Sequence, residues 1–292
     1  MTCRQIVLVI VAASATCLHA QQTYGPTVTG SLGLITLRSA QTLPAATVSG
    51  GMYFNMYDRE GYTQRGQNAD RSLSYDANMW TLGASFGLKE QVEIDTSLSF
   101  ESLYDASERA GVIGGRYFQD SFSASGWGPL EVGAKWRLLS DESFRRGVAV
   151  ETRMTIPISH NVIAGASVGY ELRVDAMQPN WILNLAYRDR GDSNIAANRR
   201  EATIGIGFAH SLNERLDVLT EVVAERAFEG NRRPPTALDV TVGTRYWLGS
   251  GRWSVGGGVR VNAAMATHGF RNSSPVGAVV GVSVSPTFFA TQ

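Results

Sequence analysis

The sequence predicts an all-β chain folded as an up-and-down antiparallel transmembrane β-barrel of about 12 strands. Three observations predict this fold. Segments of roughly ten residues alternate apolar residues with small or polar ones. The connections between the segments are alternately short and long, and the charged residues of the segments fall on one face.

The overall composition already excludes some classes of protein. The chain has 292 residues, of which 26 are Lys or Arg and 26 are Asp or Glu. A nucleic-acid-binding protein normally carries a basic excess to meet phosphate, so we expect no nucleic-acid partner. Charged residues make up 18% of the chain and 31 residues are glycine. Compared with averages of about 25% charged residues and about 7% glycine, these values favour a glycine-rich β structure.

The first 20 residues have the features of a secretory signal peptide. Arg4 gives a positive start, residues 6–15 form an apolar run, and Leu18, His19 and Ala20 give a small-residue end. The apolar run is too short for a spanning helix, so we expect cleavage and export. Both cysteines lie in this segment, which leaves the exported chain without a thiol for a disulfide, a metal site or catalysis.

Residues 21–45 precede the first predicted strand. They are too apolar for a disordered tail and too short for a domain. We expect this segment to enter the barrel lumen as a plug or to lie along the periplasmic rim. The predicted organisation is therefore a signal peptide (1–20), an N-terminal segment (21–45) and a transmembrane β-barrel (46–292).

The alternation that defines the barrel recurs twelve times. In residues 92–101, for example, Val92, Ile94 and Leu98 lie on one face while Glu93 and Asp95 lie on the other. No segment shows sustained helical periodicity. The twelve predicted strands cover residues 48–57, 80–88, 92–101, 130–138, 148–156, 168–174, 181–187, 204–208, 216–222, 238–248, 253–261 and 276–284.

The connections distinguish a membrane barrel from a soluble β-sandwich, because both folds show the same alternation. The even-numbered connections are short, at residues 89–90, 140–144, 178–180, 213–215 and 249–252. The odd-numbered connections are longer and polar, at residues 58–76, 105–127, 159–166, 189–200, 229–236 and 266–275. Short turns at one end and long loops at the other are typical of a bacterial outer-membrane barrel.

The charged face of the strands is predicted to line the lumen, since a Lys or Arg in mid-strand facing lipid would cost about 2–4 kcal/mol. The face carries twelve acids and seven bases, so a pore would prefer cations or neutral solutes to anions. The alternative is that the charges pair across strands and only satisfy one another. The lumen-lining candidates are Glu131, Lys135, Arg137, Glu151, Arg153, Glu171, Arg173, Asp175, Arg188, Asp217, Glu221, Glu225, Asp239, Arg245 and Arg260.

Catalysis has little support in the sequence. After the signal segment the histidines are His160, His210 and His268, and none lies in a cluster with the spacing of metal ligands. His268 with Ser273 or Ser274 is the candidate for a hydrolase site, and it remains a remote alternative. The glycine-rich stretches lack the strand-turn-helix context of phosphate-binding loops. We therefore expect no catalytic site, no bound metal and no cofactor.

Several segments resemble those of known outer-membrane barrels. Residues 128–139 (GPLEVGAKWRLL), with 184–187, 213–216 and 241–246, resemble strands and turns of the barrels grouped as meta-pathway phenol-degradation transporters and of related uncharacterised barrels. The pattern from Gly33 through Pro44 is similar to the start of many such barrels, including those fused to OmpA-like domains. The resemblance implies the barrel fold and hydrophobic or aromatic solutes, and no OmpA-like C-terminal domain is expected here.

Two functions therefore remain open. The first is a passive channel or porin for small solutes in the outer membrane of a Gram-negative bacterium, with a narrow charged lumen. The second is a sealed structural barrel whose long loops, such as 58–76 and 105–127, contact partners at the cell surface. In both cases we expect a monomer that contacts outer-membrane lipid and the barrel-assembly machinery.

Overall fold

The structure is a computed structural model of the chain. It describes residues 24–29, 31–60, 73–108, 111–113, 116–118, 122–141, 145–158, 168–189, 200–228, 237–249, 253–263 and 276–284. The predicted signal peptide, His160, His268, Ser273 and Ser274 lie outside the described residues.

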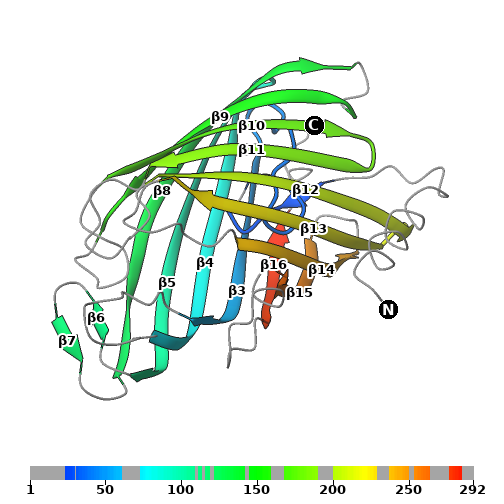
Figure 1. The fold of residues 1–292 in the computed structure, drawn as a ribbon. Helices are drawn as coiled ribbons and strands as arrows, with labels where there is room; N and C mark the ends of the chain where they lie inside the picture. Colours follow the sequence, from blue (N-terminus) through cyan, green and yellow to red (C-terminus); the bar gives the residue numbers. More distant parts are fainter. Residues whose placement is uncertain are drawn as a thin grey trace.

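Twelve antiparallel strands close into a barrel, with the last strand paired to the first (Figure 1). The fold class predicted from the sequence is confirmed. In order around the barrel the strands are β3 (Val48–Glu60), β4 (Leu73–Lys89), β5 (Val92–Glu108), β8 (Phe122–Ser140), β9 (Gly147–Ile156), β10 (Gly169–Gln178), β11 (Trp181–Asp189), β12 (Arg200–Asn213), β13 (Leu216–Ala227), β14 (Ala237–Leu248), β15 (Trp253–Asn262) and β16 (Val276–Val284).

The predicted bounds of the two longest loops were wrong. Strand β4 begins at Leu73, β5 continues to Glu108 and β8 begins at Phe122, so all three extend into the predicted loops 58–76 and 105–127. A small hairpin of β6 (Gly111–Ile113) and β7 (Arg116–Phe118) lies between β5 and β8. Backbone ladder bonds need no lipid beside them, so pairing continues where the apolar alternation has already ended.

The two faces of the strands differ as the alternation predicts. On β10, Tyr170, Leu172 and Val174 are exposed on the outer face, whereas Glu171 and Asp175 are buried on the inner face. Exposed large hydrophobic side chains recur in this way around the barrel, from Val48 on β3 to Val282 on β16. Such an outer face is stable against lipid acyl chains and unfavourable in water. No helix in the described part of the chain has the length and hydropathy to cross a membrane.

The N-terminal segment lies inside the ring of strands, where Figure 1 draws it in blue. We call residues 24–46 the plug. Two short strands, β1 (Gly25–Pro26) and β2 (Leu32–Gly33), pair with each other inside it. Its aliphatic side chains are among the most buried in the molecule, with Leu34 1% and Leu43 0% exposed. The apolar core of this protein is therefore built between the plug and the inner wall, not between two sheets.

Candidate functional site

One carboxylate of the wall holds three consecutive residues of the plug. Glu221 on β13 accepts the backbone N–H groups of Ile35 (2.7 Å), Thr36 (2.8 Å) and Leu37 (3.1 Å) on Oε1. Its Oε2 accepts the Thr36 hydroxyl at 2.7 Å. Hydrogen bonds to an ionised acceptor are the stronger class. Glu221 thus satisfies plug N–H groups that no strand partner satisfies.

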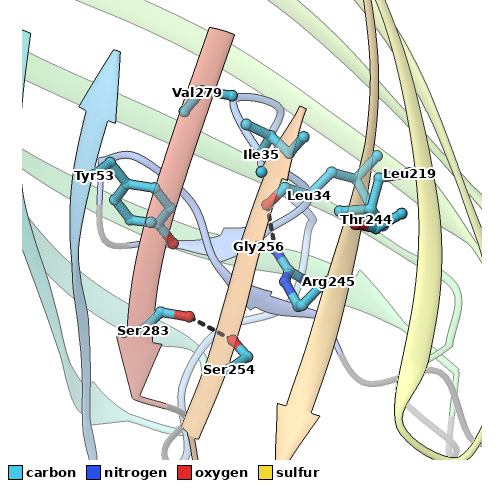
Figure 2. A pocket seen from close by; sticks show the side chains of 12 residues that line it. Leu34, Ile35, Tyr53, Leu219, Thr244, Arg245, Ser254, Gly256, Val279 and Ser283 are labelled. Carbon is cyan, nitrogen blue, oxygen red and sulfur yellow. Dashed lines mark hydrogen bonds between the residues drawn. The ribbon is translucent and has the colours of Figure 1, made fainter. Parts of the chain in front are cut away.

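Two further wall side chains bind the plug through its main chain. Asn184 on β11 accepts the Arg38 N–H (2.9 Å) and donates to the Arg38 carbonyl (2.7 Å). Arg245 on β14 donates to the carbonyls of Gly33 (3.2 Å) and Leu34, and Figure 2 shows its guanidinium pointing at the Leu34 oxygen. The wall therefore recognises mainly the backbone of the plug.

The end of the plug nearest the short turns is held by Glu93 on β5 and Lys135 on β8. Glu93 accepts the Ser31 hydroxyl (2.7 Å) and the Leu43 N–H (2.9 Å). Lys135 donates to the Gln41 carbonyl (2.9 Å) and lies 3.4 Å from Glu93. Both charges are fully buried, so each needs the partners it has.

Glycines in the wall make room for the aliphatic side chains of the plug. A Cβ added at Gly207 would lie 2.4 Å from Leu34 Cδ1, and one added at Gly205 would lie 2.4 Å from Leu37 Cδ2. Real carbon atoms do not approach so closely, so a larger residue at either position would displace the plug. The glycine content noted in the sequence is used here for close packing.

The plug leaves little free space against strands β14 to β16. Figure 2 shows a cavity bordered by Leu34 and Ile35 of the plug, with Tyr53 and Arg245 of the wall. Its volume is about 10 Å³. This is the lower limit for holding one water molecule, so a solute has no room on this side of the plug.

A second group of charges lies on six neighbouring strands, β5 and β8 to β12. Strand pairing places Asp95, Arg153, Glu171, Arg188 and Glu201 at one height, with Gly133 between the first two. We call these five residues the charged row. Acids and bases alternate along it, which is the arrangement that lets cross-strand neighbours pair.

The charges of this row form ion pairs with one another and with adjacent side chains. Arg153 pairs with Asp95 and with Glu131 (2.8 Å), and Arg188 donates to Glu171 (2.8 Å) and lies 3.6 Å from Glu201. Arg173, at the next height, also pairs with Glu171. Cross-strand pairing, which the sequence left open as an alternative role for these charges, is therefore present in the structure.

The remaining predicted lumenal residues lie apart from these contacts. Asp217 accepts the Trp247 indole N–H (2.7 Å) and the Ser211 hydroxyl (2.5 Å) at the short-turn end of β13. Arg137 is 8% exposed near the end of β8. Glu225, Asp239 and Arg260 lie half-buried toward the long-loop ends of β13, β14 and β15. His210 lies on the outward register of β12.

The sequence did not single out three residues that the structure places in the site, namely Arg38, Asn184 and Tyr53. Arg38 carried a usable signal, because it is the only charged residue between positions 21 and 47. It is 2% exposed, pairs with Glu151 and donates from Nε to the Thr29 hydroxyl (2.9 Å). Burial, helped by nearby arginines, lowers the pKa of Arg38 to about 9, so it stays cationic at neutral pH.

Comparison with known proteins gives structural relatives only. No family model matches the chain and no curated protein matches it. The COG4313 outer membrane channel from Pseudomonas putida F1 is similar in structure, with a TM-score of 0.54 at 10% identity over 86% of this chain and 99% of that one. The KdgM porin gives a TM-score of 0.47 at 12% identity over 81% and 98%. The Pseudomonas putida toluene transporter TodX gives 0.46 at 10% identity over 92% and 100%. At these identities the similarity to the first structure supports the fold alone.

Proposed function

We propose that this protein is an outer-membrane channel for small solutes whose lumen is closed by its own N-terminal plug. The single observation that carries the proposal is the way in which the plug is held. It is held inside a closed barrel by hydrogen bonds and by the ion pair of Arg38 with the wall, and its short strands β1 and β2 pair with each other instead of joining the barrel. The plug can therefore leave while every barrel strand keeps its partners.

Other features support the same proposal. The outer face of the strands suits lipid, and the short turns and long loops are sorted to opposite ends as in outer-membrane barrels. Residues 1–20 would direct export, after which the short-turn end faces the periplasm. The lumenal wall is lined with charge, so polar or charged solutes fit the open state best. The solute class implied by the sequence resemblance, hydrophobic or aromatic molecules, fits this wall less well.

A reversible tether between plug and wall tests the proposal. A Cβ at position 147 would lie 3.8 Å from the Cβ of Ala40, within the separation of about 3.5–4.5 Å that a disulfide needs. We would make Ala40→Cys with Gly147→Cys, and replace Cys3 and Cys17 by alanine. The Cβ at 147 also lies 2.8 Å from the Leu139 carbonyl, so the strand must shift slightly. The reduced form of the same variant controls for that shift.

Planar-bilayer recordings of the purified protein give the readout. We expect ion-conducting openings in the reduced form and at least about tenfold fewer in the oxidised form, because the tether keeps the plug in the lumen. Full recovery should follow addition of a reductant. Correctly inserted protein that stays silent in both forms would overturn the channel function and favour a sealed, structural barrel.

A further inference from the structure

We propose that the lumenal wall around Glu151 is a binding site for guanidinium-type organic cations, which Arg38 of the plug occupies in the closed barrel. When the plug is displaced, a cationic solute takes its place. The second statement rests on the channel function proposed above, whereas the first does not.

The position of Arg38 is the first observation. Its guanidinium is buried deep in the lumen and pairs with Glu151, which is itself 1% exposed. Asn184 fixes its backbone on both sides, through the N–H and the carbonyl. A long charged side chain loses much rotamer freedom on burial, so a surrounding that holds it must complement it well.

The charge balance of the surrounding wall is the second observation. Arg38 interacts with seven charged residues of strands β5 and β8 to β10, of which five are acids and two are bases. These wall residues are Asp95, Glu131, Glu151, Arg153, Glu171, Arg173 and Asp175. Burial, Arg153 and Arg173 disfavour the positive charge of Arg38, and Asp95 and Glu171 offset part of this effect. Without Arg38 the wall has an excess of three negative charges in a buried place, which favours another cation.

Unsatisfied acceptors are the third observation. Asp95 Oδ2, Glu151 Oε2 and Asp175 Oδ2 are buried and have no hydrogen-bond partner in the described part of the chain. All three carboxylates belong to the seven wall residues that interact with Arg38, and none is more than 1% exposed. A guanidinium presents several N–H donors in one plane and is more weakly hydrated than an ammonium, so it suits such acceptors best. Among described residues no group of three acids or histidines is arranged to hold a metal ion.

Chemical rescue tests the site without any need for conductance. Ala40 is fully buried, so a thiol at this position reports whether the plug is seated. We would compare Ala40→Cys with Ala40→Cys/Arg38→Ala, both without Cys3 and Cys17, and measure the rate of labelling by a maleimide. Losing a buried ion-pair partner should raise the rate at least about tenfold. Heat-modifiable migration in gels checks that each barrel is folded.

Ethylguanidinium chloride is the probe. It should lower the labelling rate of the Arg38→Ala variant at least about threefold and in a saturable way, while sodium chloride at the same ionic strength should not. Adding Glu151→Gln should abolish this rescue, because the carboxylate that receives the cation is gone. Arg38→Lys should give an intermediate rate. An unchanged rate in Arg38→Ala, equal effects of the two salts, or rescue that survives Glu151→Gln would overturn the site.

The solute half of the proposal has its own readout. In the reduced tether variant, agmatine added on the long-loop side should reduce the potassium current, and Glu151→Gln should remove that block. Current that is insensitive to agmatine would overturn the solute assignment and leave the channel standing. A silent barrel that still shows ethylguanidinium rescue would overturn the channel and leave the site standing.

Discussion

Buried charges in two regions of the lumenal wall have different kinds of partner. In the charged row, acids and bases of neighbouring strands pair with one another, as Glu171 on β10 does with Arg188 on β11. On β13 and β14, Glu221 and Arg245 instead bind the N–H and carbonyl groups of the plug. Apart from Arg188, which is half-buried, the charged residues of both regions are buried, so the difference lies in where their partners come from. The ion pairs of the charged row stabilise the barrel itself, whereas the hydrogen bonds of Glu221 and Arg245 hold the plug in place.

This difference means that the barrel and the plug can be perturbed separately. When the plug leaves, Glu151 beside the charged row loses Arg38, and the residues of the row keep their pairs with one another. Glu221 then loses its four hydrogen bonds from the plug, and its carboxylate is solvated by water instead. An open state therefore leaves carboxylates without their plug partners at Glu221 on β13, at Glu151 on β9 and at Glu93 on β5.

The largest effect should come from Glu171→Gln, which leaves Arg173 and Arg188 without their shared carboxylate. Breaking a buried pair by removing one partner costs about 3–5 kcal/mol, so the free energy of unfolding in urea should fall by that order. The labelling rate of a thiol at position 40 should rise by less than about fivefold, because Glu171 provides only part of the favourable charge around Arg38. A second variant with Arg188→Gln added should recover part of the stability. If the plug loosens as much as the barrel weakens, the two regions are not separate.

The next effect, of about 2–3 kcal/mol, should come from Glu221→Ala and should fall on the plug. Backbone N–H groups of Ile35, Thr36 and Leu37 lose their acceptor, so the seated plug becomes less stable than the hydrated one. Labelling at position 40 should rise by about 30- to 100-fold, with the unfolding transition of the barrel nearly unchanged. Glu214→Gln, on an exposed turn, is the matched control. An unfolding transition shifted as far as in Glu171→Gln would contradict the comparison.

A smaller effect is expected where the plug packs on glycine. In Gly207→Ala the new methyl group would lie 2.4 Å from Leu34 Cδ1, and overpacking of this kind costs about 1–3 kcal/mol. Labelling at position 40 should therefore increase by about tenfold or more. Leu34→Ala in the same chain removes the clash and should bring the rate back toward the parent value. If the double variant is as loose as the single one, the contact does not seat the plug.

The barrel could be predicted from the sequence because lipid imposes a rule on every strand. Residues that face lipid, such as Leu172 and Val174, must be apolar, so apolar residues recur at every second position of a strand. The rule ends at the membrane boundary, so it could not place the start of β4 at Leu73 or of β8 at Phe122. Beyond that boundary the strands still pair through their backbones, but no lipid requires apolar side chains on their outer face.

The contacts of the plug could not be predicted for a different reason. The composition of residues 21–45 showed that they are too apolar for a disordered tail, and a lumenal position was one of two expected places. Which wall residues meet the plug depends on the relative heights of strands far apart in sequence. Arg38 and Glu151 are separated by 113 positions, and only the register of the closed barrel brings them together. Asn184 gave no signal, since an asparagine in a strand is unremarkable until its neighbour is known.

The smallest predicted effect concerns the connection between the plug and the first barrel strand, β3. Ala46 has a φ of 59°, a left-handed conformation that costs a non-glycine residue roughly 1–2 kcal/mol. Ala46→Gly relieves that cost but gives the unfolded chain more freedom, so we expect a net gain below about 1 kcal/mol in urea unfolding. Ala45→Gly, whose φ is not positive, should lose about 0.5–1 kcal/mol instead. Because both residues are exposed, a difference in sign between the two variants isolates the backbone conformation from packing. Equal losses in both would show that the left-handed conformation of Ala46 carries no strain.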